Sequence, residues 1–209
     1  MIDPQVVTYL RSFVPERDEL LQEIERQAEA DYIPILDLET AGFLRVFLQI
    51  ARPQAILELG TAIGYSGIWM ARNTEAHVTT IERDLVRSAQ ARANFERAGL
   101  QERITLLEGD ALELIEGLGE FDLVFLDAAK GQYPRFLERI GPHLKPGGIL
   151  LSDNVLFQGL VSGEPEVKHK LRTMINRLRE YNRLLADHPQ YETTFLPLGD
   201  GLAVSVKRT

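Results

Sequence analysis

Short apolar runs alternate with longer segments of helical periodicity through most of the chain. The apolar runs predict β-strands at residues 55–60, 77–82, 104–109, 121–127 and 148–153. The periodic segments predict helices at residues 16–30, 38–51, 64–73, 85–98, 133–140 and 166–186. Strands that alternate with helices are typical of βαβ units, in which successive strands run parallel. The pattern therefore predicts an α/β fold with a mostly parallel sheet and helices on both faces.

Two further apolar runs close the chain, at residues 191–198 and 202–207. A Gly-Asp-Gly turn at residues 199–201 separates them, and a turn of this kind is typical of an antiparallel hairpin. The expected sheet thus has seven strands. We expect a single domain over residues 1–209, in which residues 1–51 form a helical lid or a dimer surface.

Composition narrows the class of protein. The chain has 209 residues, 44% of them hydrophobic, which suits one globular domain with a sizeable core. It has no cysteine, so disulfides and thiolate metal sites are excluded. It shows no basic segment ahead of an apolar run at its start, and no stretch approaches the ~18 apolar residues that span a bilayer, so we expect a cytoplasmic protein without a membrane partner. The formal net charge of -8 argues against a surface that coats nucleic acids.

A glycine turn follows the first predicted strand. Gly60 ends the strand and Gly64 begins the next helix, a spacing that differs from the G-x-G-x-x-G of dinucleotide-binding folds. Thr61 and Ala62 carry side chains where a pyrophosphate needs bare backbone. A nucleoside without phosphates therefore fits this turn better than a dinucleotide does.

Acidic residues follow the next two predicted strands. Glu82 lies 22 residues after Gly60, where a carboxylate can accept both hydroxyls of a ribose. Asp110 follows the third strand, where it could meet an adenine amino group. Together with the glycine turn, these acids predict a nucleoside site. The alternative is an ordinary strand, turn and helix with solvated acids.

Oxygen ligands follow the fourth and fifth predicted strands. Asp127 ends the fourth strand, Asp153 ends the fifth and Asn154 follows it, so all three are expected where the carboxyl ends of parallel strands line a ligand crevice. Their oxygens favour magnesium, calcium or manganese. Lys130 lies near the start of the following helix, where the helix dipole disfavours a cation, and this favours a role beside an oxyanion. The alternatives are ordinary cap or turn residues and a solvated lysine.

These motifs resemble those of the metal-dependent class I S-adenosylmethionine (SAM) O-methyltransferases of the catechol and caffeoyl-CoA type, which have a Rossmann-like fold. Within that family the motifs are most similar to bacterial enzymes that methylate 5-hydroxyuridine in tRNA. The stretches that carry the resemblance are ILELGTAIGYS (56–66), TIER (80–83), GDALEL (109–114), DAAKGQY (127–133), DNVLFQGLV (153–161) and HPQYETTFLPLGDGLAVS (188–205).

The resemblance implies a role for each candidate residue. Those implied to bind SAM are Ile35, Glu58, Gly60, Ser66, Glu82, Asp110, Ala111 and Asp127. Glu82 would hold the ribose, Ser66 and the turn at Gly60 the amino-acid end, and Asp110 with Ala111 the adenine. Those implied to bind Mg²⁺ are Asp127, Asp153 and Asn154, and Lys130 would act with Asp127 in catalysis. The late glutamate that orients the second hydroxyl in catechol enzymes has no match that we can place.

The substrate is less constrained. At about 100° per residue, Lys168, Arg172, Arg179 and Arg183 fall within a roughly 60° arc of the last predicted helix. Such a row suits an RNA backbone, although a solvated face has the same spacing. With the resemblance, it predicts methylation of 5-hydroxyuridine to 5-methoxyuridine in a tRNA anticodon loop. The resemblance and the two helices predicted ahead of the sheet lead us to expect a homodimer. The alternatives are a small catechol-type substrate and a non-catalytic nucleoside-binding module.

Overall fold

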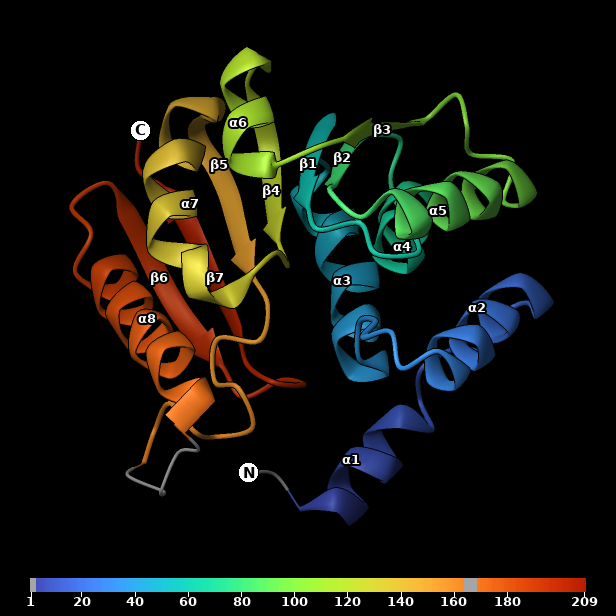
Figure 1. Ribbon diagram of the computed structural model, residues 1–209, viewed down its shortest axis with the longest axis horizontal. Coiled ribbons are helices and arrows are strands. Elements are labelled where there is room, and N and C mark those ends of the chain that lie inside the picture. The colour runs from blue at the N-terminus through green and yellow to red at the C-terminus, as the bar shows by residue number, and fades with distance from the viewer. Residues whose placement is uncertain (1–2, 164–168) are drawn as a thin grey trace. The chain divides into compact units, whose positions relative to one another are not determined.

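The computed structural model describes residues 3–163 and 169–209 (Figure 1). The chain forms two compact units, an N-terminal unit that ends at Ala111 and a C-terminal unit that begins at Leu112. No helix within the described residues combines the length and the apolar character needed to cross a bilayer.

The N-terminal unit begins with three helices and continues with alternating strands and helices. Its strands lie in the order β3-β2-β1, and both pairs are parallel, as the pattern predicts. The elements are α1 (Pro4–Arg11), α2 (Glu19–Ala30), α3 (Leu38–Ala51), β1 (Ala55–Leu59), α4 (Tyr65–Arg72), β2 (His77–Glu82), α5 (Leu85–Arg97) and β3 (Ile104–Glu108).

Local sequence explains most of these helix boundaries. Asp18 caps α2 by accepting a hydrogen bond from the Leu21 amide at 3.0 Å, and Asp84 caps α5 in the same way. α1 is an element that the apolar pattern does not predict, because it has no buried residue. Its start does carry a local signal, since Asp3 caps the helix and Pro4 occupies the first turn.

The C-terminal unit contains the remaining four strands in the order β4-β5-β7-β6. β5 pairs with β4 in parallel and with β7 antiparallel, and β6 and β7 form the predicted hairpin. The elements are α6 (Ala111–Leu114), η1 (Ile115–Gly117), β4 (Phe121–Leu126), η2 (Lys130–Gln132), α7 (Tyr133–Ile140), η3 (Gly141–His143), β5 (Leu144–Ser152), α8 (His169–Ala186), β6 (Tyr191–Leu196) and β7 (Leu202–Lys207).

Strand boundaries in this unit differ from the prediction. β4, β5 and β6 end at Leu126, Ser152 and Leu196, before the predicted ends at residues 127, 153 and 198. β5 starts at Leu144, earlier than expected, because Leu144 still pairs with Phe121 across an irregularity in the register. α8 is described from His169 onward, and the predicted start at residues 166–168 lies outside the described residues. The described part of the helix buries Ile175, Leu178, Tyr181 and Leu185.

Candidate active site

The predicted glycine turn joins β1 to α4 in the N-terminal unit. Gly60 and Gly64 have φ angles of 103° and 87°, in the region that favours glycine. A Cβ atom at Gly64 would lie 2.6 Å from the Phe95 ring. Ala62 also has a positive φ, 47°. The chain therefore turns sharply here and brings backbone amides to the start of α4, as a cofactor turn requires.

Glu58 and Ser66 meet beneath this turn. Glu58 is fully buried, and a buried carboxylate is costly unless it is hydrogen-bonded. The Ser66 hydroxyl donates to Glu58 Oε1, and the Thr80 hydroxyl donates to Oε2 at 2.6 Å. A Cβ at Gly67 would lie 3.2 Å from the same carboxylate. The structure thus brings two of the predicted SAM-binding residues into direct contact.

Glu82 is held over the turn at the end of β2. Its Oε2 accepts a hydrogen bond from the Ala62 amide at 2.8 Å, and its Oε1 accepts one from the Asp84 amide at 2.9 Å. The side chain is buried, so these bonds fix the direction of the carboxylate. The geometry suits a group that accepts hydrogen bonds from a ribose.

The other predicted SAM-binding residues of this unit lie nearby in the chain or before the sheet. The Gly109 amide donates to the Glu82 carbonyl oxygen at 2.9 Å, which places the half-buried Asp110 and Ala111 just beyond the end of β2. Ile35 is half-buried in the loop between α2 and α3. The roles of these residues stay predictions.

The predicted metal ligands follow adjacent strand ends in the C-terminal unit. Leu126 and Ser152 are partners in the β4–β5 register, and the Asp153 amide donates to the Leu126 carbonyl oxygen at 3.0 Å. The Tyr133 hydroxyl lies 2.9 Å from the Asp153 carbonyl oxygen and 3.2 Å from that of Leu126. Tyr133 therefore ties the two strand ends together, and Asp127 and Asp153 emerge side by side.

Lys130 contacts this pair of acids through Asp127. Its ammonium forms an ion pair with Asp127 Oδ1. Burial raises the pKa of the Asp127 carboxyl, and the charge of Lys130 opposes that rise. The predicted role of Lys130 beside a reacting oxyanion stays a prediction.

The donor set fits a hard divalent cation. Asp153 is buried and its Oδ1 accepts a hydrogen bond from the Asn154 amide at 2.8 Å, while Asn154 adopts a φ of 57°. The described residues contain no cluster of three His, Cys, Asp or Glu side chains that could hold a metal. Two carboxylates and one amide oxygen would leave other positions for water or substrate, as is usual for Mg²⁺.

Comparison with known proteins decides the family. The family model described as O-methyltransferase matches residues 12–208. This chain belongs to the O-methyltransferase family. A catechol O-methyltransferase of Niastella koreensis is 31% identical over 204 residues, which cover 91% of this chain and 90% of the relative. A caffeoyl-CoA O-methyltransferase of Populus kitakamiensis is 27% identical, with 94% and 89% covered.

Solved structures agree with that assignment. A Staphylococcus aureus protein provisionally assigned as a caffeoyl-CoA O-methyltransferase has a TM-score of 0.91 and 34% identity, covering 97% of this chain and 99% of its own. A Bacillus cereus O-methyltransferase in complex with SAH has a TM-score of 0.86 and 28% identity, covering 98% and 97%. The predicted Rossmann-like methyltransferase fold is confirmed. The protein is a SAM-dependent O-methyltransferase, so the reading as a non-catalytic nucleoside-binding module is set aside.

Asp200 is a candidate site residue of this O-methyltransferase to which the sequence motifs assign no role. It lies in the β6–β7 turn, and its carboxylate accepts a hydrogen bond from the Gln158 amide. Its carbonyl oxygen accepts one from the Leu156 amide at 3.0 Å. Burial raises the pKa of the Asp200 carboxyl, whereas the hydrogen bond from the Gln158 amide and the charge of Lys130 lower it. An acid between two glycines in a turn was the available signal.

The predicted row of four cations on α8 is interrupted. Arg172 and Arg183 are exposed, and Lys168 lies outside the described residues. Arg179 is half-buried and donates from Nε to the Val161 carbonyl oxygen at 3.1 Å and from Nη2 to that of Leu160 at 3.3 Å. Its guanidinium therefore holds the loop after Asp153 and Asn154, a use that helical spacing alone does not reveal.

Proposed function

We propose that this protein transfers the methyl group of SAM to one hydroxyl of a small aromatic substrate that carries two adjacent oxygens. The observation that carries the proposal is the placement of Asp127, Asp153 and Asn154 after two neighbouring strand ends, with Lys130 paired to Asp127. The catechol and caffeoyl-CoA names of the relatives support this class of substrate. This small-molecule interpretation fits the comparisons better than the tRNA interpretation does.

We further propose that Asp127, Asp153 and Asn154 hold a divalent cation, with Mg²⁺ as the expected ion. When bound, such an ion lowers the pKa of a coordinated hydroxyl. Lys130 would stabilise the oxyanion by the charge of its ammonium, or, as the neutral amine, accept at Nζ the proton that leaves the reacting oxygen. The ion pair with Asp127 keeps Lys130 directed at the position where that charge develops.

The N-terminal unit would hold the methyl donor in this scheme. Glu82 accepts hydrogen bonds from the ribose hydroxyls, and Ser66 with Glu58 binds the amino-acid end at the start of α4. Alignment of donor and acceptor can supply roughly 7–11 kcal/mol of the rate enhancement. A rigid cofactor turn is consistent with such a role.

The tRNA interpretation stays a second candidate, because a 5-hydroxyuracil ring also presents two adjacent oxygens. The exposed Arg172 and Arg183 favour it, whereas the use of Arg179 within the protein weakens the proposed contact surface.

A homodimer is also proposed. α1 supports it, since this helix exposes Val6, Tyr9 and Leu10.

One assay separates the small-molecule substrate from the tRNA substrate. Purified protein is given SAM and Mg²⁺ with catechol, caffeoyl-CoA, a matched monohydroxy analogue of each, or a tRNA that carries 5-hydroxyuridine. The proposal expects methylation of the dihydroxy compounds and none of the monohydroxy analogues. Methylation of the tRNA alone would replace the small-molecule interpretation, and equal methylation of the monohydroxy analogues would contradict the two-oxygen site.

A further inference from the structure

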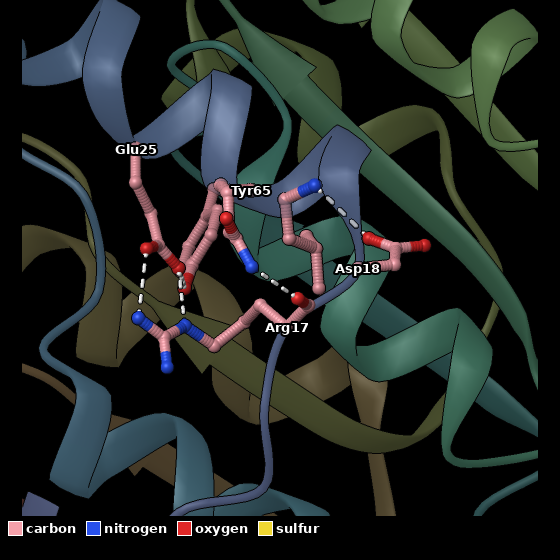
Figure 2. Close-up of polar contacts among 6 residues, drawn as sticks. Arg17, Asp18, Glu25 and Tyr65 are labelled. Atoms are coloured by element: carbon pink, nitrogen blue, oxygen red, sulfur yellow. Dashed lines mark hydrogen bonds and ion pairs between the residues drawn. The ribbon is translucent and has the colours of Figure 1, made fainter.

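α2 and α4 are joined at two points, although the residues involved are far apart in the sequence. Asp18 Oδ2 lies 2.9 Å from Arg72 Nη1. The Tyr65 hydroxyl donates to Glu25 Oε1 at 2.6 Å (Figure 2). Asp18, which caps α2, and Glu25 are seven positions apart, and so are Tyr65 and Arg72 of α4. At ~1.5 Å rise per residue, seven positions span roughly 10 Å on either helix. α2 therefore runs antiparallel to α4 and contacts both of its ends.

Glu25 is the centre of the second contact. Arg17 makes a two-pronged ion pair with it, from Nε to Oε1 at 2.9 Å and from Nη2 to Oε2 at 3.1 Å (Figure 2). Both side chains of this ion pair are 22% exposed, so it is partly shielded from water. Gln22 fixes Arg17 further by donating to its carbonyl oxygen at 2.7 Å. Glu25 is thus held as a charged acceptor that points at Tyr65.

Tyr65 connects this network to the cofactor turn. It is the first residue of α4, it is 2% exposed, and it stands between Gly64 of the turn and Ser66. Burial, aided by the hydrogen bond to Glu25, raises the pKa of the Tyr65 hydroxyl, which therefore stays a donor. A displacement of Tyr65 would move Ser66, whose hydroxyl donates to Glu58. The position of Ser66 consequently depends on a contact made by α2.

We propose that Arg17, Glu25 and Tyr65 form a latch that positions the cofactor turn and so sets the affinity for SAM. Glu25 is a positioning residue in this scheme, since it acts on SAM through Tyr65. The segment of α2 is then a fixed part of the SAM site. The simpler alternative is that the ion pair and hydrogen bond stabilise α2 on the fold with no effect on the cofactor.

The test compares variants that remove the latch with one that removes a neighbouring contact. Tyr65→Phe deletes the donor and keeps the ring, and Glu25→Ala deletes the acceptor. Glu23→Gln is the matched control, because Glu23 lies on the same helix and pairs with Arg97 of α5. The Kd of SAM is measured by calorimetry, and the melting temperature is measured on the same samples.

The proposal expects the Kd to rise roughly five- to tenfold in Tyr65→Phe and in Glu25→Ala. The Kd of SAM in the double variant should be no higher than in the single variant with the higher Kd, because both substitutions remove the same contact. Glu23→Gln should leave the Kd within about twofold. At saturating SAM, kcat should be nearly unchanged in the Tyr65→Phe protein while its KM for SAM rises.

Two results would overturn the proposal. A lower melting temperature with an unchanged Kd would show that the latch only stabilises α2. An equal rise in Kd for Glu23→Gln would show that any loosening of α2 has the same effect. If Glu25→Ala does not fold, Tyr65→Phe decides alone, since it preserves the buried ring.

Discussion

Replacement of Glu82 by alanine should weaken SAM binding without unfolding the protein. Each hydrogen bond to a charged group contributes about 1.5–3 kcal/mol, and about 1.4 kcal/mol corresponds to a tenfold change in Kd. Glu82 is expected to accept two such bonds from the ribose, and in the structure it also holds the Ala62 amide of the cofactor turn. Since water replaces part of what is lost, we expect the Kd to rise at least about tenfold by calorimetry.

Two controls separate the ribose from the turn. Glu108 is the partner of Glu82 in the β2–β3 register, and its carboxylate accepts hydrogen bonds from Ser88 and Arg92. Glu108→Ala should therefore leave the Kd within about twofold. An analogue of SAH that lacks the ribose 2′-hydroxyl should bind the wild type more weakly than SAH does. The Glu82→Ala substitution should reduce the affinity for this analogue less than it reduces the affinity for SAH. An unchanged Kd for SAM in Glu82→Ala would refute the assignment of Glu82 to the ribose.

Three further changes test other parts of the account. Gly64→Ala should lower the melting temperature by several degrees and abolish SAM binding, because residue 64 has a φ of 87° and a Cβ atom there would lie 2.6 Å from Phe95. A normal melting temperature and normal SAM binding would contradict the turn geometry. Asp200→Ala should raise the KM for the methyl-accepting substrate and leave the Kd of SAM unchanged. Asp200→Asn should retain more of the activity, because the asparagine oxygen can still accept a hydrogen bond from the Gln158 amide. Identical kinetics in both variants would exclude this loop contact as the cause. Reversal of Arg172 and Arg183 to glutamate should leave turnover of a catechol intact and raise the KM for a tRNA substrate if one is used; equal loss on both substrates would indicate a damaged helix.

Features that depend on neighbours in the sequence could be predicted. The β1 strand, the glycine turn and the β6–β7 hairpin follow from apolar runs and glycine spacing, and the structure contains all three. The acids at the strand ends could be located for the same reason, because the end of a strand is visible in the local sequence. These acids are Glu82, Asp110, Asp127 and Asp153. α1 escaped because its apolar residues are exposed and produce no buried stripe.

Features that depend on contacts between distant residues could not be predicted. Glu25 and Tyr65 are 40 residues apart, and Gln158 and Asp200 are 42 apart, so no spacing rule joins them. Arg179 illustrates the same limit, because a helical wheel gives its direction but not the carbonyl oxygens that it meets. From the local sequence, each of these residues would be taken for an ordinary helix or turn residue. Its actual partners are determined by tertiary packing.

Methyl transfer by metal-stripped protein tests the central claim most directly. Labelled SAM and a vicinal dihydroxy aromatic substrate are supplied to the wild type and to Asp153→Ala, with EDTA or with added Mg²⁺. The account predicts no transfer by the wild type in EDTA, full recovery with Mg²⁺, and no recovery in a folded Asp153→Ala protein that still binds SAM. Full activity of the stripped wild type in EDTA would contradict the role given to Asp127, Asp153 and Asn154.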